Sequence, residues 1–243
     1  MIPSLGHTDG VSDPAEHRVA VVVLAAGSGS RVGAEVNKVL LAVGDIPVVA
    51  RSVRTACEVA GVRRVVLVVR AGEQDAVQHA VEPHLPTSGP EVAMVVGGET
   101  RHRSEWAALA LLAPEIESGD IGVVAMHDAA RPLASRRLYE RVLATAAQAG
   151  GAIPVAPLPD LVAVDGSLLP ETLVGVQTPQ AFRAADLLAA HRAAAADGFE
   201  ATDTAGCLAA YADVVIGAVE SDAGNLKVTV PDDLLVAEAL SAR

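Results

Sequence analysis

The stretch VAVVVLAAGSGSRVGAEVNK, residues 19–38, joins an unbroken apolar run to a glycine-rich loop. Residues 19–25 have the length of a strand and no polar alternation, which is typical of a strand buried on both faces of a parallel sheet. Glycines after such a strand let the backbone turn tightly and present N–H groups to an anion, here Gly27, Gly29 and Gly33. Arg31 and Lys38 add positive charge. The stretch therefore predicts a phosphate-binding loop in an α/β fold, and a glycine-rich turn without a ligand is the alternative.

The rest of the chain alternates strand patterns with helical ones. Strands are predicted over residues 62–69, 91–96, 121–126, 152–156, 214–219 and 226–230. Helices are predicted over residues 47–60, 73–85, 103–113, 135–149, 182–196, 204–211 and 231–240. This alternation implies right-handed crossovers and a mostly parallel sheet. Residues 157–175 interrupt it, and Asp165-Gly166 between two alternating segments predicts a β-arm that projects from the sheet.

Composition and charge limit the possible functions. Of the 243 residues, 51% are hydrophobic and 2% aromatic, which suits one sizeable α/β domain with an aliphatic core. The net charge of -12 argues against a nucleic-acid polymer or an anionic membrane as a partner. No apolar run reaches the about 20 residues of a membrane span, and the two cysteines form no C-x-x-C pair. Residues 1–17 are polar and lack a signal-peptide pattern, so we expect a disordered tail on a cytoplasmic protein with a single domain over residues 18–243.

Two common phosphate loops do not match the first motif. The Walker loop requires Gly-Lys-Ser/Thr, which is absent, and the dinucleotide fingerprint requires G-x-G-x-x-G where this chain has G-x-G-x-x-x-G. The second predicted strand is followed by Arg70, not by the acidic residue that would hold a ribose. These departures disfavour a nicotinamide dehydrogenase.

Further motifs follow the third and fourth predicted strands. VGGETRHRS, residues 96–104, offers backbone groups at Gly98 that could read a base edge, and Ser104 could contact the base or cap the next helix. MHDAARPL, residues 126–133, places Asp128 at a strand end, where ligands of open α/β sheets bind. A carboxylate there suits Mg²⁺, which prefers oxygen ligands, and a helix cap or surface turn is the alternative. We assign no proton transfer to His127.

The C-terminal third contains VQTPQAF at residues 176–182, the pair Thr202-Asp203, and NLKVT at residues 225–229. Lys227 is one of only two lysines in the chain, with Lys38. A lysine fixed near a phosphate loop suits a contact to a triphosphate or to a transition state. An exposed strand lysine is the alternative for Lys227, and a helix N-cap is the alternative for Thr202-Asp203.

The ordered set LAAGSGSRVG…NK, GGETRHRS, HDAARP, TPQAF, TD and NLKVT resembles the 2-C-methyl-D-erythritol 4-phosphate cytidylyltransferase family of the non-mevalonate isoprenoid pathway, from residue 19 to the C-terminus. The resemblance implies a Rossmann-like nucleotidyltransferase domain, an arm that forms a homodimer, and CTP with Mg²⁺. It implies that the nucleotide is held by Ala25, Ala26, Gly27, Gly29, Arg31 and Lys38, and that cytosine is read by Gly98, Glu99 and Ser104. Asp128 would lie near the metal with Arg131 close by, and Thr202 and Lys227 would contact the acceptor phosphate and the reacting centre. Arg31, Lys38, Asp128 and Lys227 are the catalytic residues implied.

Several positions depart from the family pattern, mainly on the acceptor side. Pro170 and Glu171 stand where an arginine of the arm is usual, the arm is shorter, and Thr204 follows Thr202-Asp203 where an acidic residue is common. The predicted reaction is in-line attack of an acceptor phosphate oxygen on the α-phosphorus of CTP, with pyrophosphate leaving. A cytidylyltransferase for another polyol phosphate, such as ribitol 5-phosphate, and a non-catalytic CTP-binding paralogue are the alternatives.

Overall fold

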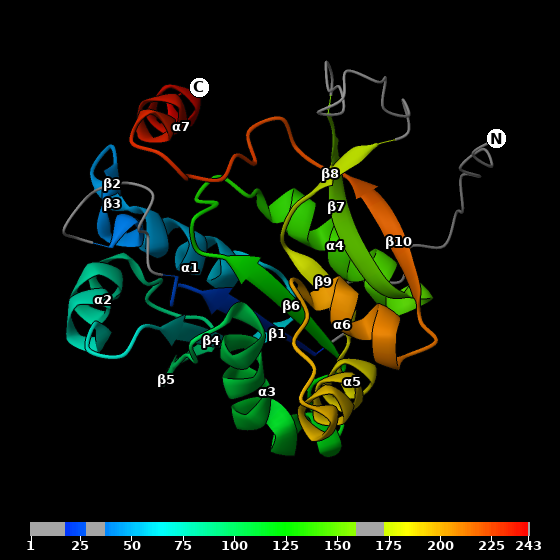
Figure 1. Ribbon diagram of the computed structural model, residues 1–243. Helices are drawn as coiled ribbons and strands as arrows, with labels where there is room; N and C mark the ends of the chain where they lie inside the picture. Colours follow the sequence, from blue (N-terminus) through cyan, green and yellow to red (C-terminus); the bar gives the residue numbers. More distant parts are fainter. Residues whose placement is uncertain (1–17, 28–36, 159–172, 243) are drawn as a thin grey trace.

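A central sheet organises the computed structural model, which describes residues 18–27, 37–158 and 173–242 (Figure 1). Its main strands run in the order β10-β7-β9-β6-β1-β4-β5, and β8 pairs with β7. The strands are β1 (Val19–Leu24), β4 (Val62–Val69), β5 (Glu91–Val96), β6 (Val123–Asp128), β7 (Gly150–Pro157), β8 (Val174–Val176), β9 (Gln180–Arg183) and β10 (Val215–Glu220). The β1–β4, β1–β6, β4–β5 and β7–β10 pairs are parallel. The predicted α/β fold with a mostly parallel sheet is confirmed.

Helices cover both faces of the sheet. Alternate residues of β1 point to opposite faces, so Val21 and Val23 join one apolar cluster while Ala20 and Val22 join another. The first cluster packs against α1 (Val48–Glu58), α2 (Gln74–Val81), α4 (Arg136–Ala149) and α7 (Asp232–Ser241). The second packs against α3 (Arg101–Glu117), α5 (Ala184–Asp197) and α6 (Thr204–Tyr211). Burial on both faces explains why β1 carries no polar alternation.

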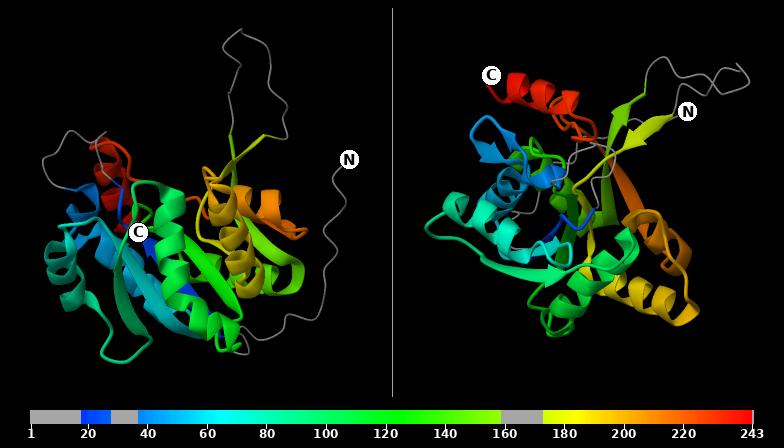
Figure 2. Two further views of the ribbon diagram at one scale, coloured as in Figure 1. Left: turned by 60° about the horizontal axis from the view of Figure 1, so that its bottom comes forward. Right: turned by 60° about the vertical axis from the view of Figure 1, so that its left-hand side comes forward.

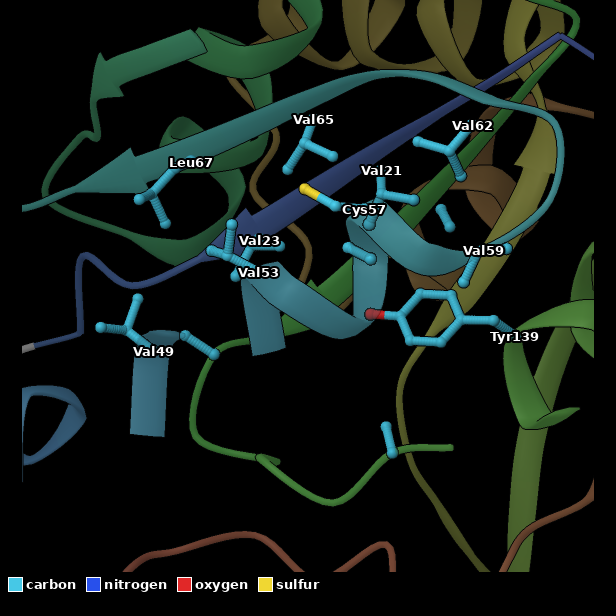
Figure 3. Packing of buried hydrophobic residues seen from close by; sticks show 14 of the residues in the cluster. Val21, Val23, Val49, Val53, Cys57, Val59, Val62, Val65, Leu67 and Tyr139 are labelled. Carbon is cyan, nitrogen blue, oxygen red and sulfur yellow. The ribbon is translucent and has the colours of Figure 1, made fainter. Parts of the chain in front are cut away.

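The core consists mainly of small aliphatic side chains in close contact (Figure 3). Val49 and Val53 on α1 pack against the β1 and β4 valines, and Tyr139 from α4 is the largest fully buried side chain among the described residues. The Cys57 thiol is buried in this cluster. Burial, with a smaller effect of Glu58, raises its pKa to about 11, which suits a structural thiol.

Two predicted elements differ from the structure. Residues 182 and 183, predicted as the start of a helix, belong instead to β9, and α5 begins only at Ala184. The backbone of β9 pairs antiparallel with both β6 and β7, and these long-range pairings outweigh the local helical pattern. Residues 226–230 form no strand. Val228 N–H donates to Ala130 O at 2.8 Å, and the next two N–H groups donate to the Asp233 carboxylate at 2.6 and 2.9 Å.

Other boundaries shifted by a few residues. α3 begins two residues before the prediction because the Thr100 side chain caps it, and it continues through Pro114. Short elements complete the described chain: η3 (Lys38–Leu40), η4 (Glu82–His84) and the β2–β3 hairpin (Ala42–Val43 and Ile46–Pro47). Among the residues that the structure describes, no helix is long and apolar enough to cross a membrane.

The parallel register brings several strand ends to one edge of the sheet. Leu24 at the end of β1 lies opposite Val68 of β4 and Asp128 of β6, and Val69 of β4 lies opposite Val96 of β5. The phosphate loop, the GGET turn and Asp128 therefore share one edge. At another part of the sheet, β7 and β8 extend outward as the base of the predicted arm (Figure 2). The predicted N-terminal tail and residues 159–172 of the arm lie outside the described residues.

Candidate active site

A cavity of about 760 Å³ lies at the carboxyl ends of β1, β4, β5 and β6. Its wall is formed by the loop after β1, the turn between β5 and α3, and the end of β6. Lys38 at the start of η3 and Lys227 before α7 complete the wall. The volume falls within the about 300–1,000 Å³ range of ligand pockets in proteins. Lys38 and Lys227, the two lysines of the chain, are far apart in the sequence but line the same cavity.

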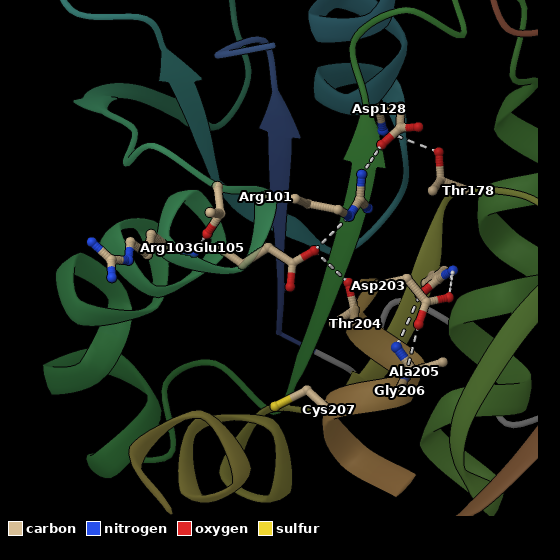
Figure 4. A network of polar contacts seen from close by, with 12 residues as sticks. Arg101, Arg103, Glu105, Asp128, Thr178, Asp203, Thr204, Ala205, Gly206 and Cys207 are labelled. Atoms are coloured by element: carbon tan, nitrogen blue, oxygen red, sulfur yellow. Dashed lines mark hydrogen bonds and ion pairs between the residues drawn. The ribbon is translucent and has the colours of Figure 1, made fainter. Parts of the chain in front are cut away.

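Asp128 lies between two cations at the cavity. Arg101 Nη1 donates a hydrogen bond to Asp128 Oδ1 (Figure 4). Lys227 Nζ lies 2.6 Å from Asp128 Oδ2. Burial alone would raise the pKa of this carboxyl, but Arg101 and Lys227 outweigh burial and hold its pKa well below the usual range. Asp128 is therefore ionised at neutral pH and orients both cations.

A set of buried hydrogen bonds fixes the loop that carries Lys227. Asn225 is 1% exposed, and its Nδ2 donates to Thr178 O at 3.0 Å and to Gln177 Oε1 at 2.9 Å. Arg131 Nη1 donates to Asn225 O at 2.8 Å. Each of these contacts joins residues far apart in the sequence, so Lys227 is held by tertiary contacts and not by a strand.

Lys38 is held by its neighbour Asn37. The Asn37 side chain is buried, its Oδ1 accepts from Val39 N–H at 3.3 Å, and its Nδ2 donates to Glu73 Oε2 at 2.6 Å. The first contact caps η3 and the second ties η3 to the residue that precedes α2. The Asn37 side chain thus fixes the backbone on both sides of Lys38.

The GGET turn approaches the phosphate loop closely. A Cβ on Gly97 would lie 2.7 Å from Ser104 Oγ and 2.8 Å from Ala26 Cβ, so only glycine fits there without movement. Ser104 lies inside α3, and its Oγ donates to Gly98 O at 3.3 Å. Thr100 is the N-cap, since its Oγ1 accepts from Arg103 N–H at 3.2 Å. The alternative that Ser104 caps the helix is therefore wrong.

His127 is fully buried behind the site. Its Nδ1 lies 3.2 Å from Thr178 Oγ1 and its Nε2 lies 3.2 Å from Arg131 O. Because Thr178 Oγ1 accepts from Asp128 N–H at 3.0 Å, its own proton is free to go to Nδ1, which leaves the ring proton on Nε2. Burial lowers the His127 pKa to about 4, so the ring is neutral and positions backbone groups.

The structure places the predicted site residues in three groups. Nine line the cavity: Ala25, Ala26, Gly27, Lys38, Gly98, Glu99, Ser104, Asp128 and Lys227. Arg131 is buried behind the wall, and Thr202 lies outside the cavity, next to the α6 N-cap residue Asp203. Gly29 and Arg31 lie outside the described residues.

Sequence reasoning missed two arginines of the cavity wall, Arg70 and Arg101. Both follow directly from the strand-end rule, since one comes just after β4 and the other opens α3 after β5. Arg101 contacts Asp128 as described above, and it also lies near Glu105 on the same helix. Its position five residues after the end of β5 was the signal that could have found Arg101.

Two groups of side chains carry atoms of the kind that bind metal ions. Asp128 offers carboxylate oxygens at the cavity, which suits a hard cation that takes its other ligands from phosphates and water. His102, His191 and Cys207 also lie close together in the interior, with ligand atoms within 4.8 Å of one another. The two imidazole planes are stacked at 6°, so their in-plane lone pairs run parallel and do not converge on one ion. The histidine–cysteine group is therefore not assigned as a metal site.

Comparison with known proteins gives a consistent result. The family model described as IspD, 2-C-methyl-D-erythritol 4-phosphate cytidylyltransferase, matches residues 19–243. A protein of that name from Pelotomaculum thermopropionicum is 39% identical over 233 residues, covering 92% of this chain and 94% of the relative. One from Bacillus velezensis is 33% identical over 226 residues, covering 90% and 94%. The crystal structure of the Thermus thermophilus enzyme of that name superposes with a TM-score of 0.71 at 32% identity, covering 93% of this chain and 100% of that one.

Proposed function

The chain belongs to the 2-C-methyl-D-erythritol 4-phosphate cytidylyltransferase family, and from this premise we propose that it transfers the cytidylyl group of CTP to 2-C-methyl-D-erythritol 4-phosphate. The products are 4-diphosphocytidyl-2-C-methyl-D-erythritol and pyrophosphate. The protein is a nucleotidyltransferase of isoprenoid biosynthesis. The observation that carries the proposal is the meeting of Lys38, Asp128 and Lys227 at one cavity beside the phosphate loop.

The mechanism follows from the charges at the cavity. A phosphate oxygen of the acceptor attacks the α-phosphorus of CTP, and the bond from that phosphorus to the bridging oxygen of pyrophosphate breaks. Negative charge builds on the phosphoryl oxygens, and both substrates are anions. Lys38, Arg101 and Lys227 supply positive charge at the wall of a chain that is acidic overall. We assign catalysis to positioning and charge neutralisation by these side chains, with Arg31 expected to contribute from outside the described residues.

Mg²⁺ is part of the proposal. Asp128 would hold the ion together with phosphate oxygens of CTP, since this carboxylate stays ionised and faces the cavity. The ion would supply further neutralisation of the triphosphate. Gly98 and the exposed Glu99 follow β5, and the end of β1 separates them from Asp128 at the end of β6. We propose that the Gly98 backbone, Glu99 and Ser104 contact the cytosine base.

The first test is pyrophosphate release from CTP and Mg²⁺ with two acceptors. We expect turnover with 2-C-methyl-D-erythritol 4-phosphate and a strong preference for it over ribitol 5-phosphate. Preference for ribitol 5-phosphate would overturn the acceptor assignment, and pyrophosphate release from neither acceptor despite CTP binding would overturn the proposed activity.

A homodimer through the arm is also proposed. β7 and β8 form a two-stranded ribbon that extends from the sheet, and such a ribbon is barely stable when isolated in water. It carries four exposed aliphatic side chains, Leu158, Leu173, Val174 and Val176. A second copy of the chain would cover these side chains and stabilise the ribbon.

The double substitution Val174→Asp with Val176→Asp is expected to give a monomer. The two side chains lie two positions apart on β8 and so share a face, where two charges would oppose burial against a partner. Light scattering during size-exclusion chromatography measures the mass. Leu235→Asp, at an exposed apolar side chain of α7, is the matched control and should remain dimeric. A monomeric unsubstituted protein would contradict the proposal.

A further inference from the structure

Glu105 is a fully buried carboxylate on α3, one turn after Arg101. An ionised group in the interior is costly unless charged or hydrogen-bonding partners surround it. Its partners come from α3, α5 and α6, and Figure 4 shows Arg101 and Thr204 on either side of it. Thr204 Oγ1 on α6 donates to Oε1 at 2.7 Å, and His191 Nε2 on α5 lies 3.3 Å from Oε2. Arg101 Nε lies 2.9 Å from Oε1, but its N–H does not point at that oxygen, so this contact is an ion pair and not a hydrogen bond.

The His191 ring carries the charge that balances Glu105. Its Nδ1 lies 3.1 Å from Leu187 O, and its Nε2 faces the Glu105 carboxylate. The Leu187 carbonyl and an ionised Glu105 only accept hydrogen bonds, so the imidazolium form of His191 lets both ring nitrogens donate to them. The Cys207 Sγ also lies 3.8 Å from Nδ1. Burial opposes that charge, but Cys207 and Glu105 outweigh it and raise the His191 pKa to about 9. The ring of His102, stacked on His191 at 4.8 Å, is kept neutral because burial and the neighbouring charge lower its pKa.

Arg101 is therefore held by two carboxylates on opposite sides. Nη1 donates to Asp128 at the cavity, and Nε pairs with Glu105 in the interior. Asp128 is shared between two cations, since its Oδ1 contacts Arg101 and its Oδ2 contacts Lys227. A ligand that occupies an oxygen of Asp128 would weaken the Asp128–Arg101 contact. Glu105 faces away from the cavity and would keep its contact with Arg101 in that state.

We propose that Glu105 is a positioning residue, which holds the Arg101 guanidinium at the cavity wall beside Asp128 and the reacting phosphates. Thr204 and His191 hold Glu105 in turn. The effect on turnover rests on the proposed cytidylyltransferase activity, whereas the pairing of Glu105 with His191 does not. Because Glu105 does not line the cavity, it acts through Arg101 and not on the substrate.

Glu105→Gln is the central test, because it keeps the size of the side chain and removes its charge. We expect kcat to fall roughly 10- to 100-fold, as for other residues that orient a catalytic group, with little change in the KM for CTP. Glu117→Gln is the matched control on the same helix. Glu117 forms an exposed ion pair with Arg192 at 2.6 Å, and its substitution should leave kcat unchanged.

If Glu105 had a purely structural role, Thr204→Val and Glu105→Gln would lower kcat to the same extent. Thr204→Val removes one hydrogen bond to Glu105 but leaves the charge and its pairing with Arg101. We expect this variant to melt at a lower temperature yet to keep nearly full kcat well below its melting temperature. Equal kcat losses in Thr204→Val and Glu105→Gln, or a kcat of Glu105→Gln within twofold of the unsubstituted protein, would overturn the proposal.

Titration of the His191 ring by nuclear magnetic resonance provides a readout that needs no turnover. We expect the pKa of His191 to fall by at least about one unit in Glu105→Gln, since Glu105 is one of the two groups that stabilise the imidazolium and its charge is gone. An unchanged His191 titration would overturn the proposed pairing even if the protein proved inactive with every acceptor. If Glu105→Gln does not fold, Glu105→Asp keeps the charge with a shorter reach, and we expect it to retain the raised His191 pKa with a reduced kcat.

Discussion

Alanine at Lys227 or at Lys38 is expected to lower kcat by roughly 10²- to 10³-fold, by analogy with the loss of one donor to a transition-state oxyanion. Both amines lie at the wall of the same cavity, where each would neutralise charge that develops during transfer. Asp128 orients the Lys227 amine, whose Nζ lies 2.6 Å from Asp128 Oδ2. Steady-state pyrophosphate release measures kcat for each variant.

The matched control for the lysines is Arg192→Ala. Arg192 is an exposed cation on α5 that pairs with Glu117 away from the cavity, so its loss changes the net charge without changing the site. We expect its kcat to equal that of the unsubstituted protein. Circular dichroism should show the same helix content in all three variants. Near-normal rates for both lysine variants would contradict the mechanism proposed above.

Replacing Asp128 with asparagine is expected to lower kcat at least as strongly, by roughly 10²- to 10³-fold or more. This substitution removes the charge that orients Arg101 and Lys227, and it removes the carboxylate proposed to hold Mg²⁺. We therefore also expect the Mg²⁺ concentration for half-maximal activity to rise. Rate measurements over a series of Mg²⁺ concentrations separate this effect from the loss of kcat.

Asp120→Asn is the control for the second prediction. Asp120 pairs with Arg18 on the surface, and both side chains are more than half exposed, so the charge lost there has little structural effect. Its Mg²⁺ dependence should match that of the unsubstituted protein. An Asp128→Asn variant that needs no additional Mg²⁺ would exclude Asp128 as a metal ligand, even if kcat were reduced.

The sequence was sufficient to predict three strands of the sheet closely. The predicted bounds of β4 and β5 match the structure, and that of β1 differs by one residue. β1 is apolar at every position because both of its faces are buried. β4 carries Arg63 and Arg64 near its start and β5 begins with Glu91, and the apolar runs that follow these residues made both strands recognisable. Once these strands were predicted, the phosphate loop, the GGET turn and Asp128 could be placed at strand ends on one edge of the sheet. The order of these motifs was enough to indicate the family.

Long-range contacts decided the features that the sequence could not. Residues 180–183 became a strand because β6 and β7 both offered backbone partners, and residues 226–230 became a loop because Ala130 and Asp233 accept their N–H groups. The role of Arg101 and Glu105 depends on partners 27 to 99 positions away in the chain. Local patterns record which face of an element is buried. They do not record which element packs against that face, because that is decided by the folding of the whole chain.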